Sequence, residues 1–145
     1  MIEIDKGHWK FEGNIPEGSI GFVYLITDKD GKKYIGKKLL ENKKKRKPLK
    51  GRVNGRRYMV ESDWKIYCGS SPQLHEYIEK NGKEGMEFII LKFCESKLML
   101  AYEEAREIIE RKALFSKEYW NEVLNLRIRY HANKKIDNVS HCKIN

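Results

Sequence analysis

Two aromatic-rich, β-branched runs separated by a turn signal constrain this chain more than any other feature. Residues 21–27 read GFVYLIT and residues 32–40 read KKYIGKKLL, and the DKDG between them has the composition of a turn. β-Branched and aromatic residues on both sides of such a turn predict a β-hairpin.

The register of this hairpin decides whether its two tyrosines lie together. A strict two-residue turn would put Tyr24 and Tyr34 on opposite faces of the sheet, because side chains alternate along a strand. A three-residue loop over 29–31, with Gly31 in the left-handed conformation, would instead place Tyr24 opposite Gly36. Both tyrosines would then share one face, and we expect this second register.

The rest of the pattern predicts one further strand and several helices. Ser71 and Pro72 suit the first turn of a helix, and Gly82 suits its end. Residues 86–94 are densely apolar, as in a buried strand, and residues 97–114 have helical periodicity. The expected fold class is therefore α+β, with a small three-stranded antiparallel sheet flanked by helices. We also expect an N-terminal arm over 1–19 anchored by Trp9 and Phe11, short helices near 62–68 and 116–125, a main domain over 20–125 and a basic C-terminal extension over 126–145.

Size and composition narrow the class of protein. A chain of 145 residues fits one domain with short appendages. Its three cysteines, Cys68, Cys94 and Cys142, are odd in number and far apart, so neither a disulfide framework nor a zinc site is indicated. No apolar run is long enough to span a membrane, and the first ten residues lack the pattern of a signal peptide. We therefore expect a cytoplasmic protein.

Positive charge is concentrated in one segment, residues 37–57. This segment holds eleven Lys or Arg and one acid, Glu41, for a net charge of +10, whereas the whole chain carries +9. Such a tract repels itself unless a polyanion neutralises it, and nucleic acid is the simplest polyanion. A solvated disordered tract or a localisation signal is the alternative. We expect a basic loop here, with Lys38, Lys44, Arg46 and Arg52 among its nucleic-acid contacts.

The hairpin resembles the signature of the GIY-YIG nuclease family. Gly21, Phe22, Val23 and Tyr24 stand where that family has its first motif, and the second motif, YIG, is present to the letter at residues 34–36. Residues 64–91 also resemble the corresponding block of phage-encoded, free-standing homing-type members. The resemblance covers about residues 20–125 and implies a nuclease that acts on DNA.

A glutamate on the long predicted helix is the candidate metal ligand. Glu104 has Leu100 and Ile108 as its i−4 and i+4 neighbours, so it borders the apolar face, where a carboxylate needs a cation or hydrogen-bond donors. The resemblance implies that this glutamate binds one Mg²⁺ or Mn²⁺ ion. The alternative is an edge carboxylate paired with a basic neighbour. The helical wheel otherwise clusters Leu98, Tyr102, Ala105, Ile109 and Lys112 on one side and turns Glu103, Glu107 and Glu110 away.

The resemblance also implies roles for other residues. Tyr24 would be the general base, Tyr34 would be hydrogen-bonded nearby, and Lys37 and Lys38 would ease ionisation of the phenol. Ser70 and Ser71 of the GSS element would contact DNA. Arg56 and Arg57 are the first candidates for the cation that meets the phosphate, with Arg46, Arg52 and Lys65 as alternatives. Asn121 resembles the family's asparagine near the phosphate, although Asn125 competes and a helix-end cap is the structural alternative. His75 could also reach DNA.

These expectations combine into a metal-dependent DNA endonuclease that acts on duplex DNA. Cutting both strands with one small active site would require either a homodimer or sequential nicking. The main alternative is a noncatalytic DNA- or RNA-binding protein that uses the basic segment.

Overall fold

The computed structural model describes residues 4–47, 49–51 and 55–127, and the side chains of Lys45, Arg46 and Arg56 are not described within that range. Its strands are β1 (Gly21–Thr27), β2 (Lys33–Leu39), β3 (Glu41–Arg46), β4 (Arg56–Glu61) and β5 (Glu87–Cys94). Its helices are a 3₁₀ turn η1 (Trp64–Ile66), α1 (Pro72–Asn81) and α2 (Lys97–Glu110). The main sheet is antiparallel with the order β2-β1-β5, which confirms the expected α+β class with a three-stranded sheet. No helix in the described ranges is long and apolar enough to cross a membrane.

The β1–β2 hairpin has the predicted register. Tyr24 lies opposite Gly36, and Ile26 lies opposite Tyr34. Gly31 has a φ of 89°, the left-handed conformation that the three-residue loop requires. The Asp28 carboxylate accepts hydrogen bonds from the backbone of Asp30 and Lys32, so local turn chemistry fixes the pairing.

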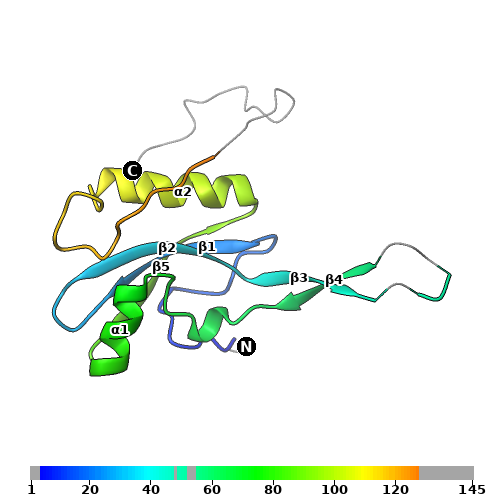
Figure 1. Ribbon diagram of the computed structural model, residues 1–145, viewed down its shortest axis with the longest axis horizontal. Coiled ribbons are helices and arrows are strands. Elements are labelled where there is room, and N and C mark those ends of the chain that lie inside the picture. Colours follow the sequence, from blue (N-terminus) through cyan, green and yellow to red (C-terminus); the bar gives the residue numbers. More distant parts are fainter. Residues whose placement is uncertain (1–3, 48, 52–54, 128–145) are drawn as a thin grey trace.

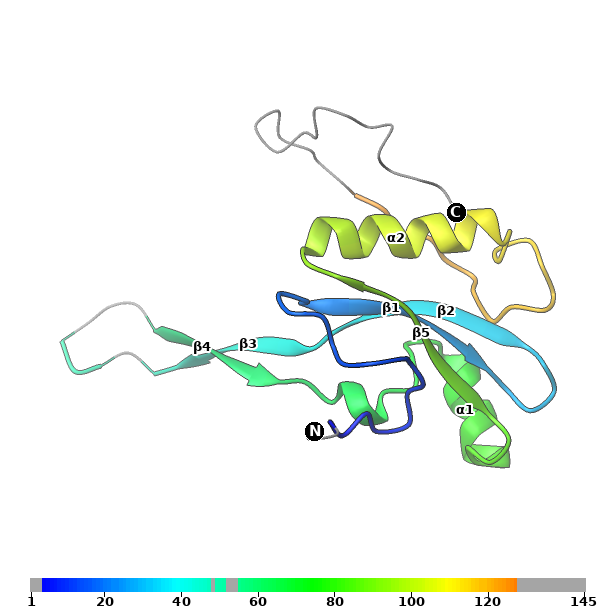
Figure 2. The same ribbon diagram turned by 180° about the vertical axis from the view of Figure 1, so that it is seen from behind.

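Two hydrophobic clusters cover the two faces of the main sheet. On one face, Phe22, Tyr24 and Ile26 pack against η1, α1 and the N-terminal arm, where Trp9 is the buried anchor that the sequence predicts. On the other face, Val23, Leu25 and Ile35 pack against α2. Figures 1 and 2 show α2 on one side of the sheet and α1 with η1 on the other.

The basic segment is not the loop that the sequence predicts. β3 and β4 pair as a separate two-stranded antiparallel sheet that projects from the body in Figures 1 and 2. A lysine run has little intrinsic strand preference, which is why a loop was expected. Tyr58, Met59 and Val60 on the returning strand are good strand formers, and they supply the pairing partner.

The helix expected over 116–125 is also absent. Residues 118–121 run beside the outer edge of β2, where the Lys33 amide donates to the Glu118 carbonyl and the Trp120 amide donates to the Lys33 carbonyl. The Trp120 indole donates to Asp28 at 3.0 Å, and Lys32 lies over its ring. An unpaired strand edge leaves backbone N–H and C=O groups without partners. Hydrogen bonding of residues 118–121 to β2 is therefore more favourable than a short amphipathic helix.

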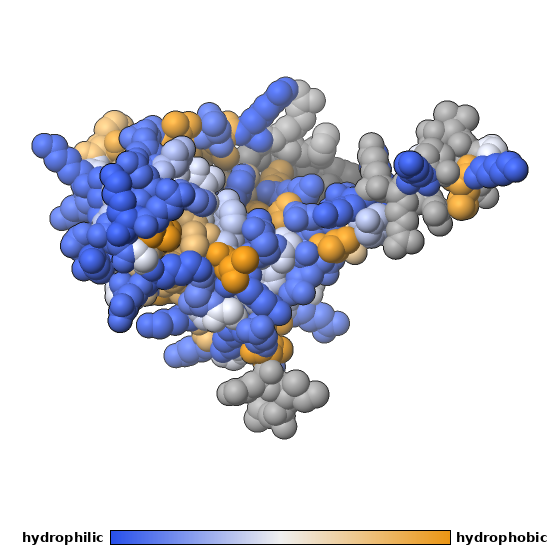
Figure 3. Space-filling view, turned by 60° about the horizontal axis from the view of Figure 1, so that its bottom comes forward, coloured by the Kyte–Doolittle hydropathy of each residue, from blue (hydrophilic) through white to orange (hydrophobic). Residues whose placement is uncertain are grey.

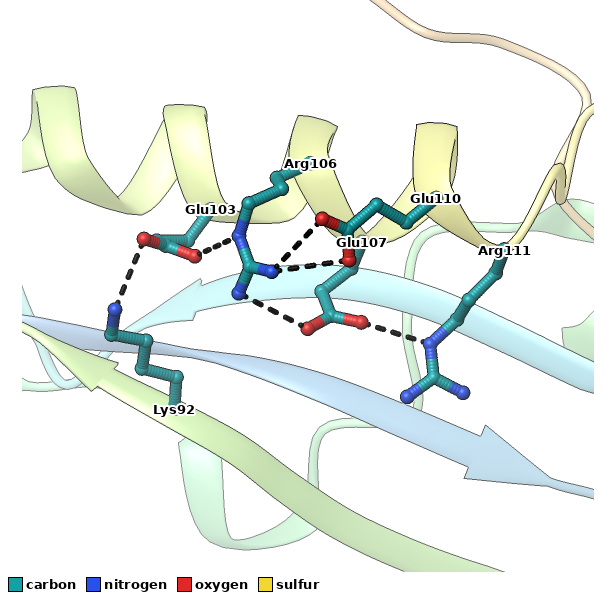
Figure 4. Close-up of polar contacts among 6 residues, drawn as sticks. All are labelled: Lys92, Glu103, Arg106, Glu107, Glu110 and Arg111. Atoms are coloured by element: carbon teal, nitrogen blue, oxygen red, sulfur yellow. Dashed lines mark hydrogen bonds and ion pairs between the residues drawn. The ribbon is translucent and has the colours of Figure 1, made fainter. Parts of the chain in front are cut away.

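The helical wheel predicted the buried and exposed side chains of α2 correctly only in part. Leu100, Ala105 and Ile108 are buried, but Tyr102 and Ile109 are exposed and Glu103 is buried. Glu103 tolerates burial because Lys92 of β5 and Arg106 bind its two carboxylate oxygens at 3.0 and 2.7 Å. Figure 4 shows this network, which Arg106 extends to Glu107 and Glu110. Pairing with a strand that is distant in sequence is invisible to a helical wheel.

Candidate active site

A pocket of about 320 Å³ opens at the outer edge of β2. Four segments form it, which the fold brings together from across the chain. They are β2 with Tyr34, Ile35 and Lys37, the start of α1 with Ser70, Ser71, Pro72 and Gln73, α2 with Glu104 and Ile108, and the C-terminal segment with Trp120, Asn121, Glu122, Val123 and Asn125.

The two tyrosines of the signature lie side by side, with ring centroids 6.2 Å apart. Tyr34 lines the pocket, and its hydroxyl is 2.8 Å from the Ser70 hydroxyl. Tyr24 is 1% exposed and lies beneath this surface. Its hydroxyl rests against Gly36, and a Cβ at Gly69 would come within 3.4 Å of it. The two glycines therefore let the phenol approach the backbone on both sides.

The environment of Tyr24 favours the neutral phenol. Burial raises the pKa of Tyr24 well above its usual value, and the nearby Tyr34, Tyr67 and Glu104 raise it further. The expectation that Lys37 and Lys38 ease its ionisation is wrong for this structure. Lys37 acts on Glu104 instead, and the Lys38 ammonium is held 2.6 Å from Asp63 and 4.0 Å from the ring centroid of Tyr67.

Glu104 is a carboxylate without a partner among the described residues. Burial raises its pKa, and the positive charge of Lys37 only partly offsets that effect. It forms no hydrogen bond or ion pair with any other residue in the described part of the chain. The alternative that a basic neighbour pairs with Glu104 therefore fails among these residues. Glu103, one position earlier, is fully engaged by Lys92 and Arg106, so the two adjacent glutamates have opposite environments.

The tyrosines and Glu104 belong to opposite faces of the sheet. Tyr24 and Tyr34 face α1, whereas Glu104 comes from α2 on the other side. They meet because β2 is an edge strand, and the pocket wraps around that edge with Tyr34 on one wall and Glu104 on the other. The site is therefore assembled around the edge of the sheet and does not lie on a single face.

Tyr67 is a member of the site that sequence reasoning missed. Its ring lies edge-on to Tyr24, with centroids 6.1 Å apart. Burial raises the pKa of Tyr67, and the nearby Tyr34 and Asp63 raise it further, while Ser70 and Tyr24 lower it. Tyr67 is therefore close to both signature tyrosines and to Ser70. The apolar sequence WKIYC gave no signal for this role, because Tyr67 reaches Tyr24 only through the turn after η1.

Asn121 lines the pocket but is bound to the sheet. Its amide oxygen accepts from the Ile35 N–H at 3.0 Å, and its amide nitrogen donates to the Ile35 carbonyl at 2.8 Å. The side chain thus continues the pairing of residues 118–120 along β2. The helix-cap alternative is wrong, because no helix is present there. Asn125 is exposed on the pocket rim.

This arrangement predicts a structural effect for Asn121. Asn121→Ala should lower the free energy of unfolding by about 2 kcal/mol, because it removes two hydrogen bonds from a buried backbone position. Asn125→Ala, the matched control, should change it by less than about 0.5 kcal/mol. Chemical denaturation measures both. Equal stability of Asn121→Ala and the wild type, with cleavage lost, would show that this amide contacts the phosphate instead.

The remaining predicted cations lie away from the pocket. Lys44 and Arg46 are on β3, and Arg56 and Arg57 are on β4 of the projecting hairpin. Lys65 lies 3.6 Å from Asp5 and 3.4 Å from Glu61, and Arg52 is outside the described residues. His75 contacts the Gly69 carbonyl. Among the described lining residues Lys37 alone is cationic, so it replaces the arginines as the candidate cation.

The pocket offers oxygen donors but no cluster of metal ligands. No group of three His, Cys, Asp or Glu gathers in the described ranges. Glu122 also lines the pocket, but its carboxylate accepts from Gln73. Glu104 is therefore the available carboxylate. A hard divalent cation is often held by one or two carboxylates together with water and substrate phosphate, so this donor set fits Mg²⁺ or Mn²⁺.

Comparison with known protein families gives a match over most of the chain. A family model described as "Putative endonuclease segE, GIY-YIG domain" matches residues 6–124. The chain belongs to the GIY-YIG family. The match contains every residue of the edge pocket up to Glu122 and Val123, together with the β3–β4 hairpin and most of the N-terminal arm. No curated protein and no solved structure gave a significant match.

The close contact between Gly36 and the Tyr24 hydroxyl in the GIY-YIG hairpin can be tested by substitution. A Cβ at this position would collide with the Tyr24 hydroxyl, so Gly36→Ala should displace the phenol and lower the cleavage rate about 100-fold. Gly21→Ala is the matched control, because its Cβ meets the Lys38 carbonyl and Leu100 outside the pocket. Both should lose about 1–3 kcal/mol of stability through overpacking. Equal cleavage rates in the two variants would contradict the placement of Tyr24.

Proposed function

We propose that this GIY-YIG protein is a metal-dependent endonuclease that hydrolyses phosphodiester bonds of duplex DNA in the edge pocket. Membership of the family implies a nuclease with DNA as its substrate. The observation that carries the finer proposal is Glu104, a half-buried carboxylate that has no partner in the described part of the chain and shares a pocket with Tyr34 and Lys37. A carboxylate placed in this way destabilises the fold unless it binds a cation.

Glu104 would hold the ion, and Lys37 would meet the negative charge of the phosphate. A bound divalent ion supplies Lewis-acid stabilisation of the charge on the leaving and nonbridging oxygens. Lys37 lies on the same wall as Glu104, and its positive charge already reaches that carboxylate. The Ser70 hydroxyl lines the opposite wall, where it can donate to a phosphate oxygen. The buried Ser71 hydroxyl, also expected to contact DNA, instead donates to Gln73 and accepts from the Leu74 amide as the cap of α1.

Tyr24 would act as the general base toward the attacking water. Because its pKa is raised, the phenol is neutral near pH 7 and must lose its own proton before it can take one from water. Tyr67, whose ring centroid lies 6.1 Å from that of Tyr24, and Ser70 at the pocket wall would form a route for that first proton. Tyr34, bound to Ser70, would fix the end of this route.

Incubation of supercoiled plasmid with the protein tests the function. With Mg²⁺ or Mn²⁺ we expect nicked and then linear DNA, and with EDTA we expect neither. Sequential nicking would give nicked circles first, whereas a homodimer that cuts both strands together would give linear DNA directly. No metal-dependent product at any salt concentration would favour the second candidate, a noncatalytic nucleic-acid-binding protein, which the basic hairpin alone would support.

A further inference from the structure

The β3–β4 hairpin is a ribbon with little support from the body. It forms its own two-stranded sheet and joins the body near Ser62, whose backbone and hydroxyl donate to the carbonyls of Leu40 and Leu39. Figure 3 shows it as a narrow projection whose coloured residues are hydrophilic and hydrophobic side by side. A two-stranded ribbon is marginally stable alone in water. Contact with a partner molecule would therefore stabilise this hairpin.

The composition of the ribbon makes it electrostatically unfavourable in isolation. β3 and β4 together hold six Lys or Arg and only two acids, Glu41 and Glu61, so like charges repel one another along the pair. Lys43, Lys44 and Arg57 form no ion pair with the described residues. A polyanion close to the ribbon would offset the repulsion between its cations and so stabilise the pairing of β3 with β4.

Cations occupy both faces of this ribbon. Side chains alternate along a strand, so Lys43 shares one face with Met59 and Arg57, whereas Lys44 shares the other with Tyr58. A ribbon charged on one face would lie along a single phosphate backbone. Charge on both faces suits a position between two backbones, and the major groove of B-DNA is wide enough for a two-stranded ribbon. The major groove of A-form RNA is too narrow.

We propose that the β3–β4 hairpin enters the major groove of duplex DNA at a fixed distance from the cut. β2 leads directly into β3 through Leu40, so the ribbon extends from the strand that carries the pocket. Lys44 follows Lys37 by seven residues, which spans at most about 23 Å of extended chain. That length corresponds to at most about 7 base pairs. The fixed offset rests on the proposed function, but insertion into the groove does not.

Dimethyl sulfate footprinting of the wild type on duplex DNA in EDTA tests insertion without cleavage. This reagent methylates guanine N7 in the major groove and adenine N3 in the minor groove. We expect protection at guanine N7 that disappears when Lys43, Lys44 and Arg57 are changed to Ser. Protection confined to adenine N3, or unchanged in the variant, would overturn the proposal.

Binding measured by fluorescence anisotropy gives an independent readout. The hairpin variant should bind duplex DNA at least about 30-fold more weakly and lose about 2.7 from the slope of log affinity against log salt concentration. The matched control changes three exposed body lysines, Lys29, Lys97 and Lys117, to Ser and should lose less than about 3-fold. Equal losses in the two variants, or an equal loss of duplex RNA binding in the hairpin variant, would contradict the proposal.

Mapping of the cut separates the two proposals. Guanine protection without metal-dependent cleavage would leave groove insertion standing and overturn the proposed function. Cleavage without guanine protection would overturn groove insertion and leave the proposed function standing. When both occur, we expect the cut to one side of the protected guanines at a constant offset of at most about 7 base pairs, because the strand from Lys37 to Lys44 sets that offset. A cut inside the protected guanines would overturn the fixed distance.

Discussion

Glu104→Gln should lower the single-turnover cleavage rate by about 1,000-fold or more while duplex DNA affinity in EDTA stays within about 3-fold. Lewis-acid stabilisation is worth several kcal/mol, and about 1.4 kcal/mol is a factor of ten in rate. Glutamine keeps the size of the side chain but is a poor ligand for a hard cation. A noncatalytic binder would have no metal-dependent rate to lose, and a variant that cleaves like the wild type would remove Glu104 from the reaction.

The same variant should be more stable than the wild type. Burial raises the pKa of Glu104 above its ordinary value of 4.5. The favourable contribution of Glu104 to the free energy of unfolding is therefore present below pH 4.5 and is lost as pH rises through the pKa in the folded state. At pH 7 the substitution should therefore raise the free energy of unfolding by roughly 0.5–1 kcal/mol, a gain that shrinks toward pH 4. Thermal and chemical denaturation at the two pH values measure it.

Glu103→Gln is the matched control one residue away. Burial raises the pKa of Glu103, but hydrogen bonds from Lys92 and Arg106 outweigh it and hold the pKa below its usual value. Its contribution is thus present above pH 4.5 and lost as pH falls through the folded pKa. This substitution should cost about 2 kcal/mol at pH 7 and retain cleavage. If Glu103→Gln abolished cleavage and Glu104→Gln retained it, Glu103 would be the metal ligand in place of Glu104.

Tyr24→Phe should lower the single-turnover rate by about 100- to 10,000-fold, the usual range for loss of a general base. The ring remains to pack between Trp9 and Phe22, so the fold should survive. Near-ultraviolet circular dichroism checks that packing. Tyr34→Phe removes only a hydroxyl that contacts Ser70, and it should have a smaller effect on the rate. A larger loss in Tyr34→Phe than in Tyr24→Phe would make Tyr34 the base.

The pH dependence of the wild type follows from the environment of Tyr24. A base must be deprotonated to accept a proton, and the pKa of this phenol is raised by burial. The rate should therefore increase about tenfold per pH unit from pH 6 to 9, without a plateau below the ordinary phenol pKa of about 10. A rate that levels off near pH 7 would show that another group takes the proton.

Local chemistry explains what the sequence predicted correctly. The pairing of Tyr24 with Gly36 follows from the DKDG turn, whose geometry is set within a few residues by Asp28 and Gly31. The capped start of α1 at Ser71 is equally local. Glu104 was found because its row on the helix is apolar, and Leu100 and Ile108 are indeed buried.

The failures all involve partners that are distant in the chain. Glu103 is buried because β5 brings Lys92 to it, and Asn121 lies on β2 because an open sheet edge needs pairing. The arginines of the basic segment were expected at the pocket, but the segment pairs with itself and carries them away along the hairpin. Tyr67 joins the tyrosines only in three dimensions. Such contacts depend on the assembled fold, which no pattern along one element reveals.

Binding of Mn²⁺ to the edge pocket tests the central claim most directly. In the background of Tyr24→Phe, which should bind duplex DNA without cutting it, the signal of free Mn²⁺ in electron paramagnetic resonance reports how many ions the protein–DNA complex takes up. We predict one tightly bound ion per chain, lost when Glu104→Gln is added and retained when Glu103→Gln is added. Equal uptake by the variants with and without Glu104 would contradict a metal site at the edge of β2.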